Sequence, residues 1–215
     1  MTDVVRRIGK VHHIAVVVTD MASGALPARK FAFYIGQNLR FLPDLARMLA
    51  LGVAKAEDEQ TMREFAAAMT SILDFEIPKN RELLEKVRQL EPSAAEAALM
   101  APANFAYTRH LLTVGYCGRP ADIAAALMPC AWSYGEIGRQ FVAQLPDHPV
   151  YHDWIEFFAG REYWQSLEAS QRELERLCRG LSEGDLQRIS EIFTTSTRLE
   201  RAFWDMAYDE EQWPG

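Results

Sequence analysis

The stretch LMPCAWSYGEIG, from Leu127 to Gly138, combines a helical pattern with side chains that a plain helix core does not need. It continues an alanine-rich run, and its apolar residues recur at three- and four-residue intervals, which is the period of an α-helix. It also holds a proline, a cysteine, two large aromatic residues and a glutamate. Cys130 directly follows Pro129, a residue that weakens a helix. The stretch predicts a buried helix that carries a reactive group.

The same helical period extends outward over nearly the whole chain. Gly118 and Pro120 separate two predicted helices, and Gly180 followed by Ser182 is typical of a C-cap and then an N-cap. The β-branched run HHIAVVVTD is interpreted as part of the first helix, because tertiary packing often overrides that weak propensity. We expect helices at about 2–22, 27–56, 58–90, 102–117, 120–144, 148–159, 161–180 and 183–210. The sequence predicts an all-α bundle of about seven to eight helices in one domain, residues 1–215.

Composition excludes several classes of protein. The chain has 215 residues, is 49% hydrophobic and carries a net charge of −7, which disfavours a nucleic-acid partner. The longest apolar run, IAVVV at 14–18, is too short to span a bilayer, and no secretory signal is recognisable. Cys117, Cys130 and Cys178 form no CxxC pair, so neither a disulfide framework nor a zinc site is indicated. We expect a cytoplasmic protein without a nucleic-acid or membrane partner.

Polar residues occupy positions where the helical period requires apolar ones. They lie on the inner faces of four predicted helices: Asn38, Glu76 with Asn80, Cys130, and Glu200. Pro78 must also disturb the backbone ladder of its helix. Each residue alone has an ordinary structural explanation, since a lone helical cysteine is usually inert core and an inward glutamate often a hydrogen-bonding group. Together, with aromatic residues between them, they predict a small-molecule pocket.

Four segments carry a resemblance to the TenA family that extends over essentially the whole chain. They are GALPARKFAFYIGQN (24–38), LLTVGYCGRPADIAAALMPCAWSYGEIGRQF (111–141), HPVYHDWIEFFAG (148–160) and STRLERAFWDMAY (196–208). The resemblance implies the haem-oxygenase-like all-α fold, usually without haem, and a homo-oligomer, either a tetramer or a dimer. The characterised family enzymes are thiaminase II, or aminopyrimidine aminohydrolase. They hydrolyse the methylene substituent of thiamine or of 4-amino-5-aminomethyl-2-methylpyrimidine and need no metal or organic cofactor.

The resemblance also implies roles for individual residues. Cys130 matches the family's nucleophile, which adds to the electron-poor pyrimidine ring so that the substituent can leave. Glu200 matches the glutamate that moves protons at the ring and the leaving group. Tyr107 and Tyr134 match pocket tyrosines, and Phe203 matches the aromatic residue that stacks on the ring. We expect Cys130, Glu200, Tyr107 and Asn38 to border one cavity.

Some positions depart from the family pattern. Asn38 stands where the family usually has aspartate, Phe41 and Phe158 where tyrosine is frequent, and Asn80 where many members have histidine after a glutamate that matches Glu76. Asn38, Phe41, Glu76 and Phe158 are still expected to contact the substrate. An asparagine can accept from the amino group and donate to the ring nitrogen, but it cannot take a proton. Asn38→Asp is therefore expected to speed hydrolysis, unless the cavity is rebuilt around a neutral amide.

Three functions are compatible with these residues. The first is a hydrolase of thiamine-pyrimidine salvage with an altered substrate range, and the second is a related small-molecule-binding protein without turnover. The third is a di-iron oxidase on the same fold, for which candidate ligands are His148, His152, Glu76 and Glu136. The retained Cys130 and Glu200 favour the first function, whereas Asn38 and Phe158 favour the second. The transcriptional-regulator label given to some family members finds no support, because the chain is acidic and holds no recognisable DNA-reading module.

Overall fold

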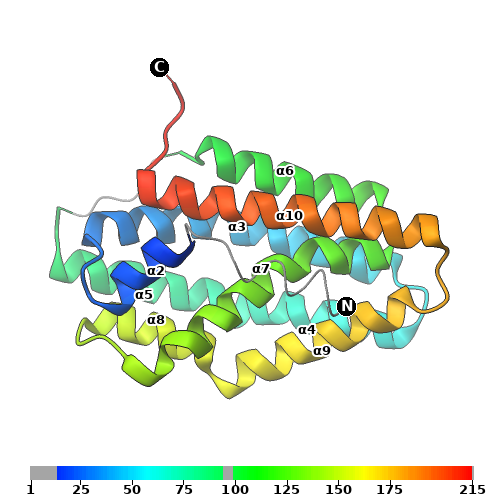
Figure 1. The fold of residues 1–215 in the computed structure, drawn as a ribbon, viewed down its shortest axis with the longest axis horizontal. Coiled ribbons are helices and arrows are strands. Elements are labelled where there is room, and N and C mark those ends of the chain that lie inside the picture. The colour runs from blue at the N-terminus through cyan, green and yellow to red at the C-terminus, as the bar shows by residue number, and fades with distance from the viewer. Residues whose placement is uncertain (1–13, 94–98, 215) are drawn as a thin grey trace.

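The computed structural model describes residues 14–93 and 99–214, and every regular element within these ranges is a helix or a helical turn (Figure 1). The elements are α2 (Ile14–Ala22), α3 (Ala28–Lys55), α4 (Glu59–Ser71), the π-helical turn η1 (Ile72–Glu76), α5 (Ile77–Leu90), α6 (Pro102–Cys117), α7 (Pro120–Phe141), the 3₁₀ turn η2 (Val142–Gln144), α8 (Pro149–Ala159), α9 (Arg161–Cys178) and α10 (Glu183–Asp209). The prediction of an all-α fold is confirmed. The part of the first predicted helix before Ile14 lies outside the described residues.

The helices begin and end near the proline, glycine and capping residues of the sequence. Proline occupies the first turn of α6, α7 and α8, where its missing N–H has no helical partner to lose. The predicted N-cap at Ser182 is confirmed, because its hydroxyl accepts a hydrogen bond from the Asp185 amide at 3.2 Å. Gly180 has a φ of +76°, which is typical of a residue that ends a helix.

The long helices form two groups that meet at the centre of the bundle. α3 packs against α4, α5 and α6, and α7 packs against α8, α9 and α10. Figure 1 shows α10 running beside α6 on one side of the molecule, while α8 and α9 lie on the other side with α7 between them. Segments distant in the sequence, such as α3 and α7, therefore both face the interior.

An aromatic cluster fills the interior where these groups meet. Tyr34 stacks on Trp204 with a centroid distance of 5.2 Å and an angle of 14°. Its hydroxyl accepts a hydrogen bond from Trp154 Nε1 at 3.2 Å and donates one to the Tyr134 hydroxyl at 3.1 Å. The polar atoms of Tyr34, Tyr134 and Trp154 thus all have hydrogen-bond partners, so the buried cluster pairs its polar groups within itself.

The helix predicted at 58–90 is continuous but contains the π-helical turn η1. Pro78 has no N–H to donate and its ring crowds the carbonyl four residues earlier, so the regular ladder cannot continue there. The chain widens by one residue instead, and the Ile77 amide donates to the Ile72 carbonyl. Leu73 and Phe75 face outward in this turn, whereas Glu76 is half-buried. The disturbance predicted at Pro78 is confirmed and sets the direction of Glu76.

Close approach of α8 to α7 depends on a glycine. A Cβ atom on Gly138 would lie 2.5 Å from the backbone nitrogen of Ala159, a distance that no side chain tolerates. This contact lets Phe158 pack on Tyr134, with 4.8 Å between ring centroids. Within residues 14–93 and 99–214, no helix combines the length and apolar character needed to cross a membrane.

Candidate active site

A cavity of about 130 Å³ lies between α3, α4 and η1 on one side and α7 and α9 on the other. Leucine, phenylalanine, isoleucine, methionine and alanine side chains form most of its wall. Its polar lining consists of Glu64, Ser71, Glu76, Cys130, Tyr134, Tyr163, Ser166, Ser170 and Glu173. Ser166 is exposed, so the cavity reaches the surface beside α9. No lysine or arginine belongs to this lining among the residues described, so the polar groups that a ligand meets are acidic or neutral.

Cys130 lies on the cavity wall, and Glu200 of α10 contacts it from behind. Burial raises the pKa of Glu200 to about 7, although contacts with Tyr107, Trp204, Ser133 and Cys130 act in the opposite direction. Glu200 Oε1 accepts hydrogen bonds from Trp204 Nε1 at 3.1 Å and from Ser133 Oγ at 3.3 Å. These two donors fix the carboxyl group beside the thiol.

The thiol of Cys130 is protonated at neutral pH. Burial raises its pKa well above the ordinary value, and the charges of Glu200 and Glu76 raise it further. The thiolate is the nucleophilic form, so Cys130 reacts only if a base removes its proton. Glu200 has the contact and, with a pKa near 7, the proton affinity to do this at neutral pH. The pair has the arrangement of an activated nucleophile.

Tyr107, Phe41 and Phe203 pack together behind the cavity wall. The ring centroid of Phe41 lies 5.0 Å from that of Tyr107 and 5.6 Å from that of Phe203. The Tyr107 hydroxyl is close enough to affect Glu200, yet it is buried and has no hydrogen-bond partner of ordinary geometry within the described part of the chain. A buried hydroxyl without a hydrogen bond lowers the stability of the fold. The Tyr107 hydroxyl can therefore donate to a ligand or to Glu200.

Some of the predicted site residues line the cavity, and the others lie outside its lining. Cys130, Tyr134 and Glu76 line the cavity, whereas Asn38, Phe41, Tyr107, Phe158, Glu200 and Phe203 do not. The expectation that Glu200, Asn38 and Tyr107 border the same cavity as Cys130 is therefore wrong for this cavity. Asn38 bonds to Asn80 instead, Phe41 packs on Tyr107 and Phe203, and Glu200 bonds to Ser133 and Trp204.

Asn38 is joined to the π-helical turn through a second asparagine. Its Nδ2 donates to Asn80 Oδ1 at 3.1 Å, and Asn80 Nδ2 donates to the Glu76 carbonyl at 2.8 Å. The two departures from the family pattern that the sequence analysis treats separately, at Asn38 and Asn80, are thus one hydrogen-bonded pair. A neutral amide pair supports the backbone of the residue that enters the cavity.

We expect Asn38→Asp to lower the free energy of unfolding at neutral pH by about 1–3 kcal/mol, the range for a buried polar group left unsatisfied. A carboxylate at this position would face Asn80 Oδ1, which cannot donate, and Asn80 Nδ2 already serves the Glu76 carbonyl. This favours the second outcome named above, a cavity built around a neutral amide. Urea unfolding measures the change, and the double variant Asn38→Asp/Asn80→His, which restores a donor, should recover stability. A fully stable single variant contradicts this account.

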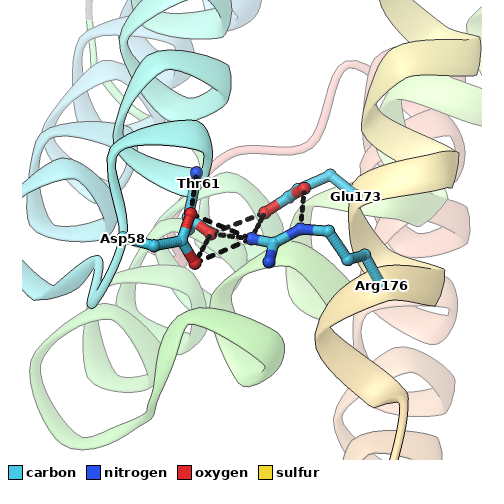
Figure 2. A network of polar contacts seen from close by, with 4 residues as sticks. All are labelled: Asp58, Thr61, Glu173 and Arg176. Atoms are coloured by element: carbon cyan, nitrogen blue, oxygen red, sulfur yellow. Dashed lines mark hydrogen bonds and ion pairs between the residues drawn. The ribbon is translucent and has the colours of Figure 1, made fainter.

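A polar network that includes the cavity-lining residue Glu173 ties α4 to α9 (Figure 2). Arg176 donates from Nε to Glu173 Oε2 at 2.8 Å and also contacts Asp58 Oδ2 at 3.0 Å. Thr61 Oγ1 donates to Glu173 Oε1 at 2.7 Å, and Asp58 caps α4 by accepting from the Thr61 amide at 2.9 Å. Arg176 holds the pKa of the buried Glu173 carboxyl below its ordinary value. The network holds the two helices that flank the mouth of the cavity.

Arg176→Met is expected to reduce the free energy of unfolding by about 2 kcal/mol, below the range for a fully buried pair because Arg176 is partly exposed. The loss arises because the Glu173 side chain, only 5% exposed, would keep its charge without a cation. Arg172→Met on the same helix is the control, since its ion pair with Glu168 is 3.8 Å long and exposed on both sides. It should change stability by less than about 0.5 kcal/mol in the same urea titration. Equal losses in both variants would show that the network adds nothing beyond a surface pair.

Three contributors to the site were not predicted from the sequence. Tyr163 lines the cavity, and its hydroxyl donates to the Ala131 carbonyl at 2.8 Å, next to Cys130. Ser133 lies one helical turn after Cys130, a spacing that could have indicated it. Glu173 lies on a strongly charged helix, so its sequence context is that of a surface residue. Its burial depends on contacts with Thr61 of α4, which the sequence does not indicate.

The ligands proposed for a di-iron site do not come together. No group of three or more histidine, cysteine, aspartate or glutamate side chains that could hold a metal ion occurs in the ranges the structure describes. The His148 ring stacks on Tyr151 instead, with 3.8 Å between centroids and an angle of 11°.

Comparisons with known proteins agree with this architecture. A model of the TENA/THI-4/PQQC family matches residues 5–210. The chain is 36% identical over 200 residues to the aminopyrimidine aminohydrolase of Halalkalibacterium halodurans, covering 91% of this chain and 88% of that protein. It is 34% identical over 194 residues to the enzyme of the same name from Helicobacter pylori, covering 89% of this chain and 88% of that protein.

Solved structures show the same fold. The crystal structure of a TenA family transcription regulator from Silicibacter sp. TM1040 superposes with a TM-score of 0.80 at 30% identity, covering 94% of this chain and 91% of that one. A domain of unknown function with a heme oxygenase-like fold from Shewanella denitrificans superposes with a TM-score of 0.72 at 12% identity, covering 96% and 89%. The second likeness concerns the fold alone and agrees with the haem-oxygenase-like bundle expected from the sequence.

Proposed function

Because the chain belongs to the TENA/THI-4/PQQC family, we propose that it is an aminopyrimidine aminohydrolase, a hydrolase that replaces the amine on the methylene carbon of an aminopyrimidine by hydroxyl. The single observation that carries the proposal is the contact between Cys130 and Glu200 at the wall of a cavity lined by aromatic and acidic side chains. Relatives of that name at 30–36% identity match most of the chain.

The reaction begins with proton transfer from Cys130 to Glu200. The thiolate then adds to an electron-poor carbon of the pyrimidine ring, and the ring loses its aromaticity. Electrons returned from the ring expel the amine from the methylene carbon, which leaves an electrophilic exocyclic methylene. The nitrogen takes up one proton as it leaves as ammonia, and the water that replaces it gives one proton up. Water adds there, the carbon–sulfur bond breaks, and the thiol regains its proton from Glu200. In the net reaction, the aminomethyl pyrimidine and water give the hydroxymethyl pyrimidine and ammonia.

The lining of the cavity supports a substrate of this kind. Its apolar side chains and the Tyr134 ring suit a flat heterocycle, and its acidic side chains suit an amine. Asn38 supports the backbone of Glu76 through Asn80, so the exchange of aspartate for asparagine alters the support of the site rather than its nucleophile. This changed support is the basis on which we propose a substrate range different from that of family members with aspartate at this position.

Ammonia release from 4-amino-5-aminomethyl-2-methylpyrimidine tests this function directly. We expect turnover with formation of the hydroxymethyl pyrimidine. Absence of turnover with this compound and with thiamine, combined with retained binding of the hydroxymethyl pyrimidine in calorimetry, would favour a small-molecule-binding protein without catalysis. Absence of both turnover and binding would overturn the assignment of the cavity to a pyrimidine.

A further inference from the structure

The carboxylate of Glu76 faces the cavity, and no side chain or backbone group of the described residues bonds to it. Its side chain lines the same cavity as Cys130, and its position at the end of the π-helical turn is set by Pro78 and by the hydrogen bond from Asn80 to its carbonyl. The side chain makes no hydrogen bond or ion pair with any residue of the described ranges. A half-buried carboxylate without a partner is unfavourable unless something else uses it.

The groups that face Glu76 are all acidic or neutral. Tyr34 of α3, Cys130 of α7, Tyr163 of α9 and Glu200 of α10 are near enough to interact with its charge. Tyr134 of α7 and Glu64 of α4 line the same cavity. None of them is a cation that could neutralise the carboxylate. A bound ligand is therefore the partner that the geometry leaves for Glu76.

Glu200 and Glu76 approach the reacting atoms from different directions. Glu200 lies behind Cys130, off the cavity wall, where Ser133 and Trp204 hold it beside the thiol. Glu76 lies on the wall itself, at the end of the π-helical turn. One carboxyl group thus serves the sulfur, and the other is open to the part of the substrate that extends into the cavity.

We propose that Glu76 is a second acid–base residue, which gives a proton to the departing nitrogen and takes one from the water that replaces it, while Glu200 serves Cys130. This inference rests on the proposed function and adds a residue to its mechanism. As the bond between methylene carbon and nitrogen breaks, the Glu76 carboxylic acid gives its proton and the nitrogen leaves as ammonia. When water adds to the methylene carbon, the Glu76 carboxylate takes the released proton. Glu76 ends as it began, so atoms and protons balance.

The acidity of the two carboxyl groups agrees with this division. Burial, together with the charge of Glu200, raises the pKa of Glu76 to about 7, and burial raises the pKa of Glu200 to about 7. Near neutral pH the two like-charged groups therefore favour a state in which one is protonated and the other is not. Catalysis needs that state, with Glu200 as the base and Glu76 as the acid.

Glu76→Gln tests the proposal, because it keeps the shape and polarity of the side chain and removes its proton. We expect kcat for the aminomethyl pyrimidine to fall about a hundredfold or more, with KM changed less than about threefold, as for loss of one acid–base group. The wild-type rate should fall above about pH 7 as Glu76 loses its proton. This decline should be missing from the slow variant. Glu76→Asp, which keeps a proton on a shorter side chain, should recover part of kcat.

Asp74→Asn is the matched control, since Asp74 is exposed in the same π-helical turn. Its kcat should stay within about twofold of wild type, as for a surface substitution. A fully active Glu76→Gln enzyme, an unchanged decline above pH 7, or equally low activity of the Gln and Asp variants would each overturn the role given to Glu76. An inactive wild-type protein would overturn the proposed function and this inference with it, so the two failures are distinguishable.

Discussion

Cys130→Ala is expected to reduce hydrolysis of the aminomethyl pyrimidine by a factor of about 10³ or more, because covalent catalysis is lost with its nucleophile. The thiolate acts in the transition state and not in ground-state recognition, so binding of the hydroxymethyl pyrimidine should change by less than about threefold. Steady-state ammonia release gives the first quantity, and isothermal titration calorimetry gives the second.

Cys178→Ala supplies the control for the cysteine experiment. Cys178 is half-buried at the end of α9 and does not line the cavity, so its removal should leave hydrolysis intact. Activity of Cys130→Ala equal to wild type would remove the nucleophile from the mechanism. Loss of binding together with activity would instead assign Cys130 a packing role on the wall.

Glu200→Gln is the second change with a large expected effect, a loss of about 10²–10⁴ in kcat, the range for a general base. Cys130 would keep a neighbour of the same shape but lose the group that takes its proton, while its own pKa is raised by burial. In the wild type, Glu200 must be deprotonated to act, so activity should rise with pH up to about 7. In the variant this rise should move to a higher pH, where the thiol ionises unaided.

Glu191→Gln tests the specificity of that result. Glu191 is exposed on α10 and bonds to Gln187 at 2.9 Å, so the variant should retain full activity with an unchanged pH profile. A Glu200→Gln enzyme whose rate still rises around pH 7 would show that another group accepts the proton of Cys130. Comparison of both profiles with that of Glu76→Gln separates the base from the acid.

Within the residues that the structure describes, the helices could be predicted almost completely, because amphipathic periodicity and the positions of proline and glycine are local properties of the chain. The same reasoning identified Cys130, Glu76 and Glu200 as polar residues on inner faces. It could not show that Asn38 bonds to Asn80, since that pairing depends on how α3 packs against α5. Nor could it show that Glu200 contacts Cys130 without lining the cavity, since that depends on how α10 packs against α7.

The direction of Glu76 depends on the number of residues in its helix as well as on their identity. The π-helical turn Ile72–Glu76 holds one residue more than an α-helical turn would, and this turn ends just before Pro78. Removing the extra residue would shift the side chains of the turn itself, while α4 and α5 keep the faces that they now bury. Single-residue insertions and deletions in this segment are thus a route by which descendants of this chain could exchange the group that faces the nucleophile, with the rest of the cavity left unaltered.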